Sequence, residues 1–422
     1  MNTLAAFPPD LLLTPVSRRP TRLDESTVST VLESPPPSYP AGPHVAPDAS
    51  VVVVTRDNLV FARLCLESLL AATDGAYEVI TVDNGSTDGT REYLSRLEAS
   101  GAPLRTLLND GNRGFARACN QGLRLARGDV LVLLNDDTIV TPGWLSRLTA
   151  HLDDPAVGMV GPTTNRIGNE AEIEAPYRTL TELLRFAHDR AEAHAGERTD
   201  IPTLTMFCVA MRRDAYEAVG ALDERFEVGL LEDDDYSLRV RNAGYRLVCT
   251  DDVFVHHFGE TSFGKLVPSG EYARLLHANR ARFEEKWGMA WRPYGRRLSR
   301  EYSDLRERIR RVVAEMVPAD ATVLVVSRGD EDLLRLYGRR AWHFPRSESG
   351  GYAGHHPGDS EEAIAQLEAL RAQGADHLLF PQTGLWWLDH YDELRRHLEG
   401  SYRTRFSEPA TCVIYELRGE RR

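Results

Sequence analysis

Short apolar runs alternate with helix-like patterns from about residue 50 onward. Residues 51–54 and 130–134 are continuous runs of Val and Leu, and residues 78–82 and 104–108 are also rich in apolar and β-branched side chains. Such runs are typical of strands buried on both faces. Between them, apolar and small residues recur at helical spacing after Asn58, after the turn at 85–89 and through 116–125. The alternation predicts an α/β fold with a mainly parallel sheet flanked by helices.

Polar side chains follow three of the predicted strands at the point where each strand ends. Thr55 and Arg56 follow the first, Asp83 the second, and Asn135, Asp136 and Asp137 the strand at 130–134. Ligands of open α/β sheets bind beyond the carboxyl ends of the strands. The sequence therefore predicts a nucleotide site at this edge of the sheet.

Changes in composition and in apolar periodicity along the chain predict four segments. Residues 1–48 are rich in Pro, Ser and Thr and are interpreted as an irregular lead-in without function rather than a docking segment. Residues 49–291 form the main α/β domain. Residues 292–318 form a basic helical linker, interpreted as solvated rather than as a membrane-surface patch because its apolar face is weak. Residues 319–422 form a small α/β domain, with strands at 322–327 and 377–380.

Composition narrows the classes of function. The chain has 50 Lys and Arg against 63 Asp and Glu, a net charge of −13, which argues against nucleic acid as the main partner. Its five cysteines are scattered without a C-x-x-C pair, so neither a disulfide framework nor a structural zinc site is expected. No apolar run approaches the roughly 18 residues of a membrane span. We expect a cytoplasmic protein, either soluble or peripheral at the inner face of the membrane.

Three groups of residues could carry chemistry, although each has an ordinary structural explanation. Asp137 could bind a divalent cation together with the phosphates of a ligand, yet an acidic pair after a strand more often caps a turn. The acids at 232–235 suit the start of a helix, and one of them could also serve as a general base. His256 and His257 end an apolar run at 253–255 and could be metal ligands or ordinary histidines at a strand edge.

Taken together, the motifs resemble the family 2 glycosyltransferases, inverting enzymes with the GT-A fold. The resemblance covers about residues 50–291, and its motifs are Val-Val-Val-Val-Thr at 51–55, Val-Asp-Asn-Gly-Ser-Thr-Asp-Gly-Thr at 82–90, Asn-Arg-Gly-Phe-Ala at 112–116, Leu-Asn-Asp-Asp-Thr at 134–138, Glu-Asp-Asp-Asp at 232–235 and His-His-Phe-Gly-Glu-Thr at 256–261. Each motif is weak alone, and their order and spacing are specific. The C-terminal piece resembles an accessory domain appended to some bacterial sugar transferases.

The resemblance implies roles for particular residues. Asp233 would be the catalytic base, and Asp137 would bind Mn²⁺ or Mg²⁺ with His256, or as the second choice His257, completing the metal site. Donor-binding residues would be Thr55, Arg56, Asp83, Asn112, Gly114, Asn120, Asn135 and Asp136. The sequence departs from the family pattern at Asn135, where Asp is common, and at Arg56, where an aromatic residue is frequent.

The function implied is metal-dependent transfer of a sugar, with inversion, from a UDP-, dTDP- or GDP-linked donor to a hydroxyl of a glycan, a lipid-linked or a small-molecule acceptor. The expected setting is synthesis of cell-surface polysaccharide or glycoconjugate. Two alternatives remain, namely a catalytically inactive module that binds sugar nucleotides or glycans, and a sugar nucleotidyltransferase. The segment at 55–59 lacks the Gly-rich basic loop typical of nucleotidyltransferases.

Overall fold

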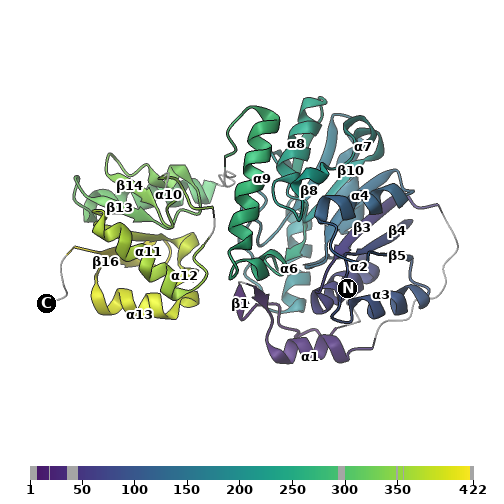
Figure 1. The fold of residues 1–422 in the computed structure, drawn as a ribbon, viewed down its shortest axis with the longest axis horizontal. Helices are drawn as coiled ribbons and strands as arrows, with labels where there is room; N and C mark the ends of the chain where they lie inside the picture. Colours follow the sequence, from purple (N-terminus) through teal and green to yellow (C-terminus); the bar gives the residue numbers. More distant parts are fainter. Residues whose placement is uncertain are drawn as a thin grey trace. The chain divides into compact units, whose positions relative to one another are not determined.

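The protein divides into two compact units, residues 1–291 and residues 292–422. The structure is a computed structural model, and it describes residues 7–18, 20–35, 46–292, 300–347, 350–354 and 356–418. Figure 1 shows each unit as a sheet with helices around it. The first unit contains every residue that the sequence assigns to the site.

The first unit is built on an eight-stranded sheet with the order β5-β4-β3-β6-β10-β8-β11-β9. The strands β3 to β6 are mutually parallel, β10 is antiparallel to both of its neighbours, β8 and β11 are parallel, and β9 is an antiparallel edge strand. The bounds are β3 Ala49–Thr55, β4 Tyr77–Asp83, β5 Leu104–Leu108, β6 Val130–Asn135, β8 Val157–Thr163, β9 Arg198–Asp200, β10 Cys208–Arg212 and β11 Arg246–Phe254. The predicted α/β class with a mainly parallel sheet is confirmed.

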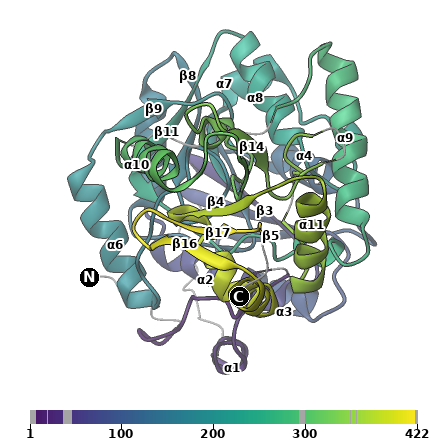
Figure 2. The ribbon, with the colours of Figure 1, turned by 90° about the vertical axis from the view of Figure 1, so that its left-hand side faces the viewer.

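Helices cover both faces of this sheet because its central strands are apolar on both sides. Val51 and Val53 of β3 belong to one core, and Val52 between them belongs to the other. The first core is closed by α2 (Leu59–Ala72), α3 (Thr90–Ala99), α5 (Trp144–Ala150) and α6 (Leu180–Ala193), and the second by α4 (Phe115–Leu125), α7 (Arg213–Val219) and α8 (Glu232–Asn242). In Figure 2, α6 and α9 (Glu271–Trp287) flank this unit on opposite sides.

The N-terminal residues are part of the first unit, which corrects the prediction of an irregular lead-in at 1–48. They form a two-stranded hairpin, β1 (Ser17–Arg18) with β2 (Thr21–Arg22), and the helix α1 (Glu25–Glu33). Leu13 and Val31 are buried in the same core as β3. The prediction failed because Pro-rich composition outweighed a few apolar residues that are far apart in the sequence.

The second unit contains a five-stranded sheet with the order β14-β13-β15-β17-β16. The three strands β13 (Thr322–Val325), β14 (Arg340–His343) and β15 (His377–Pro381) are parallel, while β16 (Arg403–Glu408) and β17 (Cys412–Glu416) complete the sheet in antiparallel pairings. The helices α11 (Ser360–Ala372), α12 (Trp386–His390) and α13 (Asp392–Ser401) pack on one face. Trp387 is buried in this core, whereas Trp386 is partly buried against it.

The opposite face of the second sheet is covered by α10 (Arg300–Met316), which corrects the prediction of a solvated linker at 292–318. Tyr302, Leu305, Ile309 and Val313 of α10 are buried against the sheet. Their spacing is that of one helical face, so this apolar stripe was present in the sequence but was obscured by the many arginines. Figure 2 shows α10 on one side of the sheet, with α11 and α13 on the other.

Two further expectations concern cysteines and membranes. All five cysteines are buried and none forms a disulfide. Within the described residues, no helix combines the length and the apolar character needed to cross a bilayer.

Candidate active site

The strand ends that the sequence analysis singled out lie next to one another. Strand β3 is paired between β4 and β6, with Thr55 opposite Asp83 and Val54 opposite Asn135. Because all three strands are parallel, their carboxyl ends open on the same edge of the sheet. The structure therefore brings together Thr55, Asp83 and the segment Asn135–Asp137.

Asp83 is a buried carboxylate at the end of β4, placed where the chain turns toward α3. It accepts hydrogen bonds from the backbone N–H groups of Gly85 (3.2 Å) and Ser86 (3.1 Å). The guanidinium of Arg91 lies 3.6 Å from the same carboxylate. These contacts fix the position of the carboxylate at the strand end.

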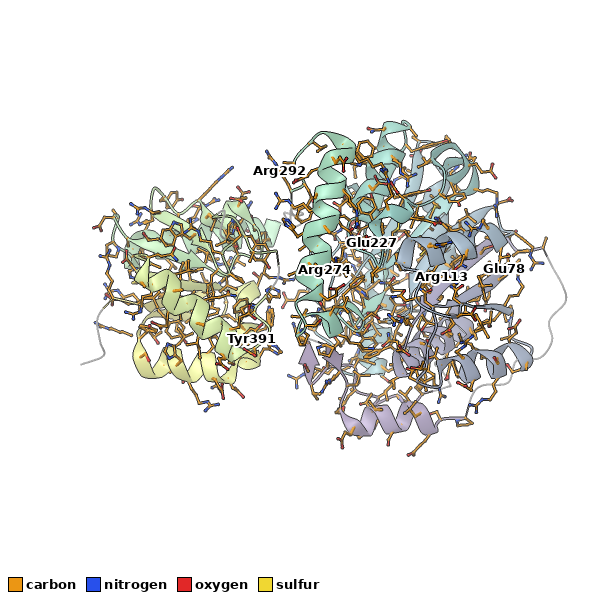
Figure 3. All side chains as sticks on the ribbon, in the orientation of Figure 1. Glu78, Arg113, Glu227, Arg274, Arg292 and Tyr391 are labelled. Carbon is orange, nitrogen blue, oxygen red and sulfur yellow. The ribbon has the colours of Figure 1, made fainter. Side chains whose placement is uncertain are left out.

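The loop before α4 is fastened to the end of β4 by side-chain amides. Asn84 Nδ2 donates to Asn112 Oδ1 at 3.0 Å, and Asn112 Oδ1 also accepts the N–H of Gly114 at 2.9 Å. Gly114 has φ +83°, and a Cβ at this position would lie 1.8 Å from the carbonyl oxygen of Glu227. Only glycine fits, because both the backbone conformation and the close contact exclude a side chain. Figure 3 labels Arg113 in this loop and Glu227 in the segment that it contacts.

Two predicted donor-binding residues occupy less central positions. Asn120 is buried, and its amide exchanges hydrogen bonds with the backbone of Leu222 and donates to Glu224 Oε1 at 3.0 Å. Its polar atoms hold residues 222–224, and its role in shaping the donor pocket stays a prediction. Arg56 is exposed, with its guanidinium 3.7 Å from Asp57.

Asp137 is the most firmly held carboxylate at the sheet edge. It is 5 % exposed, its Oδ2 accepts a hydrogen bond from Thr261 at 2.8 Å, and its Oδ1 lies 3.2 Å from Nε2 of His257. Burial alone would raise the pKa of Asp137, but the positive charge of His257 and the hydrogen bonds outweigh it and lower the pKa. In turn, burial opposes the charge on His257, while Asp137 raises its pKa.

Asp136 differs sharply from its neighbour. Burial, and then repulsion from Asp137, raise its pKa to about 7. Its Oδ1 accepts from Asn58 Nδ2 at 3.2 Å, and its buried Oδ2 has no hydrogen-bond partner. Two adjacent buried carboxylates with pKa values moved in opposite directions are typical of a functional site rather than of a turn cap.

The two histidines point in different directions, because they are successive residues of the short strand β12 (His256–His257), which pairs with β7 (Thr138–Ile139). His257 faces Asp137, donates from Nδ1 to the carbonyl oxygen of Arg166 at 2.7 Å, and stacks on Phe207. His256 instead lies 2.6 Å from the hydroxyl of Tyr177, and burial lowers its pKa to about 3. The sequence-based order, with His256 as the first choice at the metal and His257 as the second, stays a prediction, and it is His257 that lies next to Asp137.

Some of the ligands that a divalent cation would need are already in place at this site. Asp137 and His257 offer a carboxylate oxygen and an imidazole nitrogen 3.2 Å apart, and a buried Asp136 oxygen without a partner lies on the adjacent residue. Among the residues that the structure describes, no group of three or more His, Cys, Asp or Glu side chains is arranged to hold a metal ion. This agrees with the chemistry of Mg²⁺ and Mn²⁺, which are commonly bound by one or two carboxylates and completed by substrate phosphates.

The acidic stretch 232–235 forms the first turn of α8, and its four carboxyl groups have different environments. Asp235 accepts from Trp287 Nε1 at 2.9 Å and lies 2.6 Å from Lys286, and Asp234 accepts from Trp291 Nε1 at 3.2 Å. Glu232 is buried, and burial together with Asp233 raises its pKa well above the ordinary value. Asp233 is half-buried and accepts the N–H of Asp234 at 3.0 Å. Asp235 thus contacts α9, Asp234 contacts Trp291 just beyond the end of α9, and Glu232 lies in the interior.

Several site residues had no assigned role in the sequence analysis. Thr261 contacts both Asp137 and Asn58, and Asn58 in turn donates to Asp136. Lys265 donates to the backbone carbonyl of Asp57 at 2.8 Å. Thr261 was part of a recognised motif, but Asn58 was noted only as the residue before a helical pattern. Nothing in the sequence signals that residues 58 and 261 meet.

The segment that carries His257 and Thr261 is also held by the N-terminal hairpin. The N–H of Thr21 donates to the carbonyl of Glu260 at 3.2 Å, and Arg166 donates to the carbonyls of both Arg18 (3.2 Å) and Phe258 (3.3 Å). A Cβ on Gly264 would lie 2.9 Å from Cα of Pro20. The hairpin therefore supports the loop that presents these residues to Asp137.

Comparisons with known proteins match the same region. The sequence profile of Glycosyl transferase family 2 matches residues 50–220. The O-antigen biosynthesis protein RfbC of Myxococcus xanthus is 26% identical over 363 residues, which are 81% of this chain and 27% of that protein. Glycosyltransferase AglE of Haloferax volcanii is 27% identical over 221 residues, 51% of this chain and 69% of the relative. This chain thus spans about a quarter of the length of the first relative.

Among solved structures, the mannosyltransferase PcManGT from Pyrobaculum calidifontis in complex with GDP-Man and Mn²⁺ is similar to this chain, with 21% identity and a TM-score of 0.40. The similarity covers 60% of this chain and 74% of that one. With the ordered motifs, the family profile and the two sequence relatives in agreement, residues 50–220 form a family 2 glycosyltransferase domain.

Proposed function

We propose that the first unit transfers a sugar from a nucleotide-activated donor to an acceptor hydroxyl, with inversion and with the help of Mn²⁺ or Mg²⁺. The observation that carries this proposal is the buried Asp137, held by Thr261 and His257 at the edge where Asp83 also lies. A leaving nucleoside diphosphate needs its negative charge neutralised, and this chain has an excess of acids, with a net charge of −13. A carboxylate-bound divalent cation supplies that neutralisation.

Donor binding would use the carboxyl ends of β3 and β4. Asp83 would accept hydrogen bonds from the nucleobase, with Thr55 and Arg56 beside it. The loop containing Asn112 and Gly114 would line the donor pocket, and its fixed geometry is supported by the amide of Asn84. Asn135 and Asp136 would approach the sugar diphosphate. Asp137 and His257 would hold the metal ion, while His256 is expected to support this segment through Tyr177.

Asp233 would be the general base. A single displacement requires a group that removes the proton from the acceptor oxygen as that oxygen attacks the anomeric carbon from the face opposite the leaving group. The new bond forms as the bond between sugar and diphosphate breaks, so the configuration inverts and no covalent enzyme intermediate is needed. Asp233 is favoured because it is the Asp of the Glu-Asp pair in the motif at 232–235 that resembles the family, and because its half-buried side chain lies in the first turn of α8.

The acceptor class follows only from the family and from relatives. A relative is named for O-antigen biosynthesis, which supports a glycan or lipid-linked acceptor and a role in cell-surface polysaccharide. A cytoplasmic enzyme, or one bound peripherally at the inner face of the membrane, would meet such acceptors. The role of the second unit stays a prediction of an accessory domain.

The proposal is tested by incubating the full chain with UDP-, dTDP- and GDP-linked sugars, each with Mn²⁺ and with EDTA. We expect one donor to release nucleoside diphosphate in the presence of Mn²⁺ only, and proton NMR of the first sugar product to show the inverted anomer. Binding of a donor without any release would instead favour an inactive sugar-nucleotide-binding module. Release of pyrophosphate from a nucleoside triphosphate and a sugar phosphate would favour a nucleotidyltransferase.

A further inference from the structure

The loop of residues 226–231, immediately before α8, has an unusual backbone. Glu227, Leu230 and Leu231 have φ values of 48°, 79° and 69°, and Gly229 has φ 144°. Positive φ is uncommon for residues other than glycine and is unfavourable at each such position. A loop with three such residues persists only where its surroundings hold it in place.

Asn279 of α9 supplies that restraint. Its side chain is fully buried, and its Nδ2 lies 2.9 Å, 2.7 Å and 3.0 Å from the carbonyl oxygens of Phe226, Gly229 and Leu230. Two N–H donors are thus shared among three acceptors of the strained loop. The Oδ1 atom accepts from Arg282 Nη1 at 2.6 Å, which fixes the orientation of the amide, and Arg282 also bonds to Glu227.

Both ends of loop 226–231 are attached to parts of the proposed site. The carbonyl of Val228 accepts the N–H of Phe115 at 3.0 Å, next to Gly114 of the donor-binding loop. At the other end, the carbonyl of Leu231 accepts the N–H of Asp235 at 3.1 Å and so begins the helical turn that contains Asp233. The conformation of this loop therefore sets the position of Asp233 relative to the donor loop.

We infer that Asn279 is a positioning residue for catalysis, which holds loop 226–231 in its strained form and thereby fixes Asp233 against the donor-binding loop. This inference rests on the proposed function. Asn279 contacts the carbonyl oxygens of loop 226–231 and the side chain of Arg282, and its effect on Asp233 passes through loop 226–231. Without its amide donors, the loop would relax toward negative φ and Asp233 would move.

The test replaces the two amide donors while preserving side-chain size, with Asn279→Asp and Asn279→Leu. Displacement of a catalytic group by about 1 Å can lower turnover about 10²-fold. We therefore expect kcat to fall by 10- to 100-fold in both variants, using whichever of UDP-glucose, UDP-N-acetylglucosamine, dTDP-rhamnose and GDP-mannose the wild type turns over with Mn²⁺. The KM for that donor should change less than threefold, because the strand-end residues are untouched.

A matched control separates positioning from loss of stability. Leu148→Ala removes a buried side chain from α5 of the same unit and should lower the Tm while leaving kcat near the wild-type value at a temperature well below both transitions. A second variant, Leu230→Asn, introduces a residue that tolerates positive φ and should restore part of the kcat lost in Asn279→Leu.

The possible results distinguish a failure of the inference about Asn279 from a failure of the proposed glycosyltransferase function. If the wild type turns over a donor and both Asn279 variants keep its kcat, the inference is wrong and the proposed function stands. The same conclusion follows if kcat/KM falls in these variants only because KM rises. If the wild type turns over none of the donors, the proposed function fails first. A fall in the kcat of the Asn279 variants without a change in KM, and a partial recovery of kcat when Leu230→Asn is combined with Asn279→Leu, support the inference.

Discussion

At the scale of single residues, the site depends on which way neighbouring side chains point. The sequence places Asp137, His256 and His257 in recognisable motifs but cannot say which histidine meets the carboxylate. That choice is made by the pairing of β12 with β7, in which His257 lies opposite Thr138 and His256 opposite Ile139. A shift of one residue would exchange their roles. The sequence could therefore place these residues in motifs, whereas the directions of their side chains depend on strand register.

The two histidines provide a matched pair of variants. His257→Gln should lower the affinity for Mn²⁺ in the presence of UDP by about 10- to 100-fold, because it removes the imidazole that contacts Asp137. His256→Gln should change it much less, since His256 faces Tyr177. Isothermal titration at pH 7.5 measures both constants. Equal effects in the two variants would contradict the assignment of His257.

Asp233 is the residue whose replacement should affect chemistry most. Asp233→Asn is expected to lower kcat by about 10²–10⁴-fold, the usual contribution of a general base, with donor binding retained. Asp234→Asn is the neighbouring control, because Asp234 is engaged by the indole of Trp291 and should alter kcat far less. Initial rates with saturating donor measure both. Unchanged turnover in Asp233→Asn would remove this residue from the role of base.

At the scale of elements, periodic apolar patterns were informative and composition was misleading. The strands β3 to β6 have strong β-branched or Leu-rich runs, and they were predicted close to their observed bounds. The antiparallel strand β10 and the helix α6 were not assigned, although Thr179 and Glu182 form a capping box that the spacing T-x-x-E already contained. The N-terminal segment and α10 were misjudged because Pro and Arg content hid their buried residues.

The packing of the N-terminal segment has a measurable consequence. Leu13 is 1% exposed within the core of the first unit, so Leu13→Ala should lower the free energy of unfolding by about 2–5 kcal/mol. Val16, in the same segment, is 68% exposed, and Val16→Ala should change it by less than about 0.5 kcal/mol. Urea unfolding followed by fluorescence compares the two. Similar free energies of unfolding for both variants would mean that the residues before β3 do not belong to the core of the first unit.

At the scale of the whole molecule, a buried acid links stability to pH. Burial and Asp233 raise the pKa of Glu232 well above its ordinary 4.5. Between pH 4.5 and that raised value the folded state binds more protons than the unfolded state, so rising pH lowers the free energy of unfolding. The slope for one such proton is at most about 1.4 kcal/mol per pH unit.

Glu232→Gln removes this titration. The variant should gain stability relative to the wild type as the pH rises from 5 to 8, and the difference should be smallest near pH 5. Urea denaturation of both proteins at several pH values gives the comparison. If the difference between them is the same at pH 5 and pH 8, Glu232 does not carry a raised pKa in the folded protein.

For the whole molecule, the proposed function means that a chain with an excess of acids would bind an anionic donor through a cation held at one buried position. The direct measurement is titration of Mn²⁺ in the presence of UDP, dTDP or GDP into the wild type and into Asp137→Asn, with Tm values confirming that both are folded. The account predicts Mn²⁺-dependent binding of at least one of UDP, dTDP and GDP by the wild type, and at least about tenfold weaker binding of the same nucleotide by Asp137→Asn. Equal Mn²⁺-dependent affinity in the two proteins would contradict it.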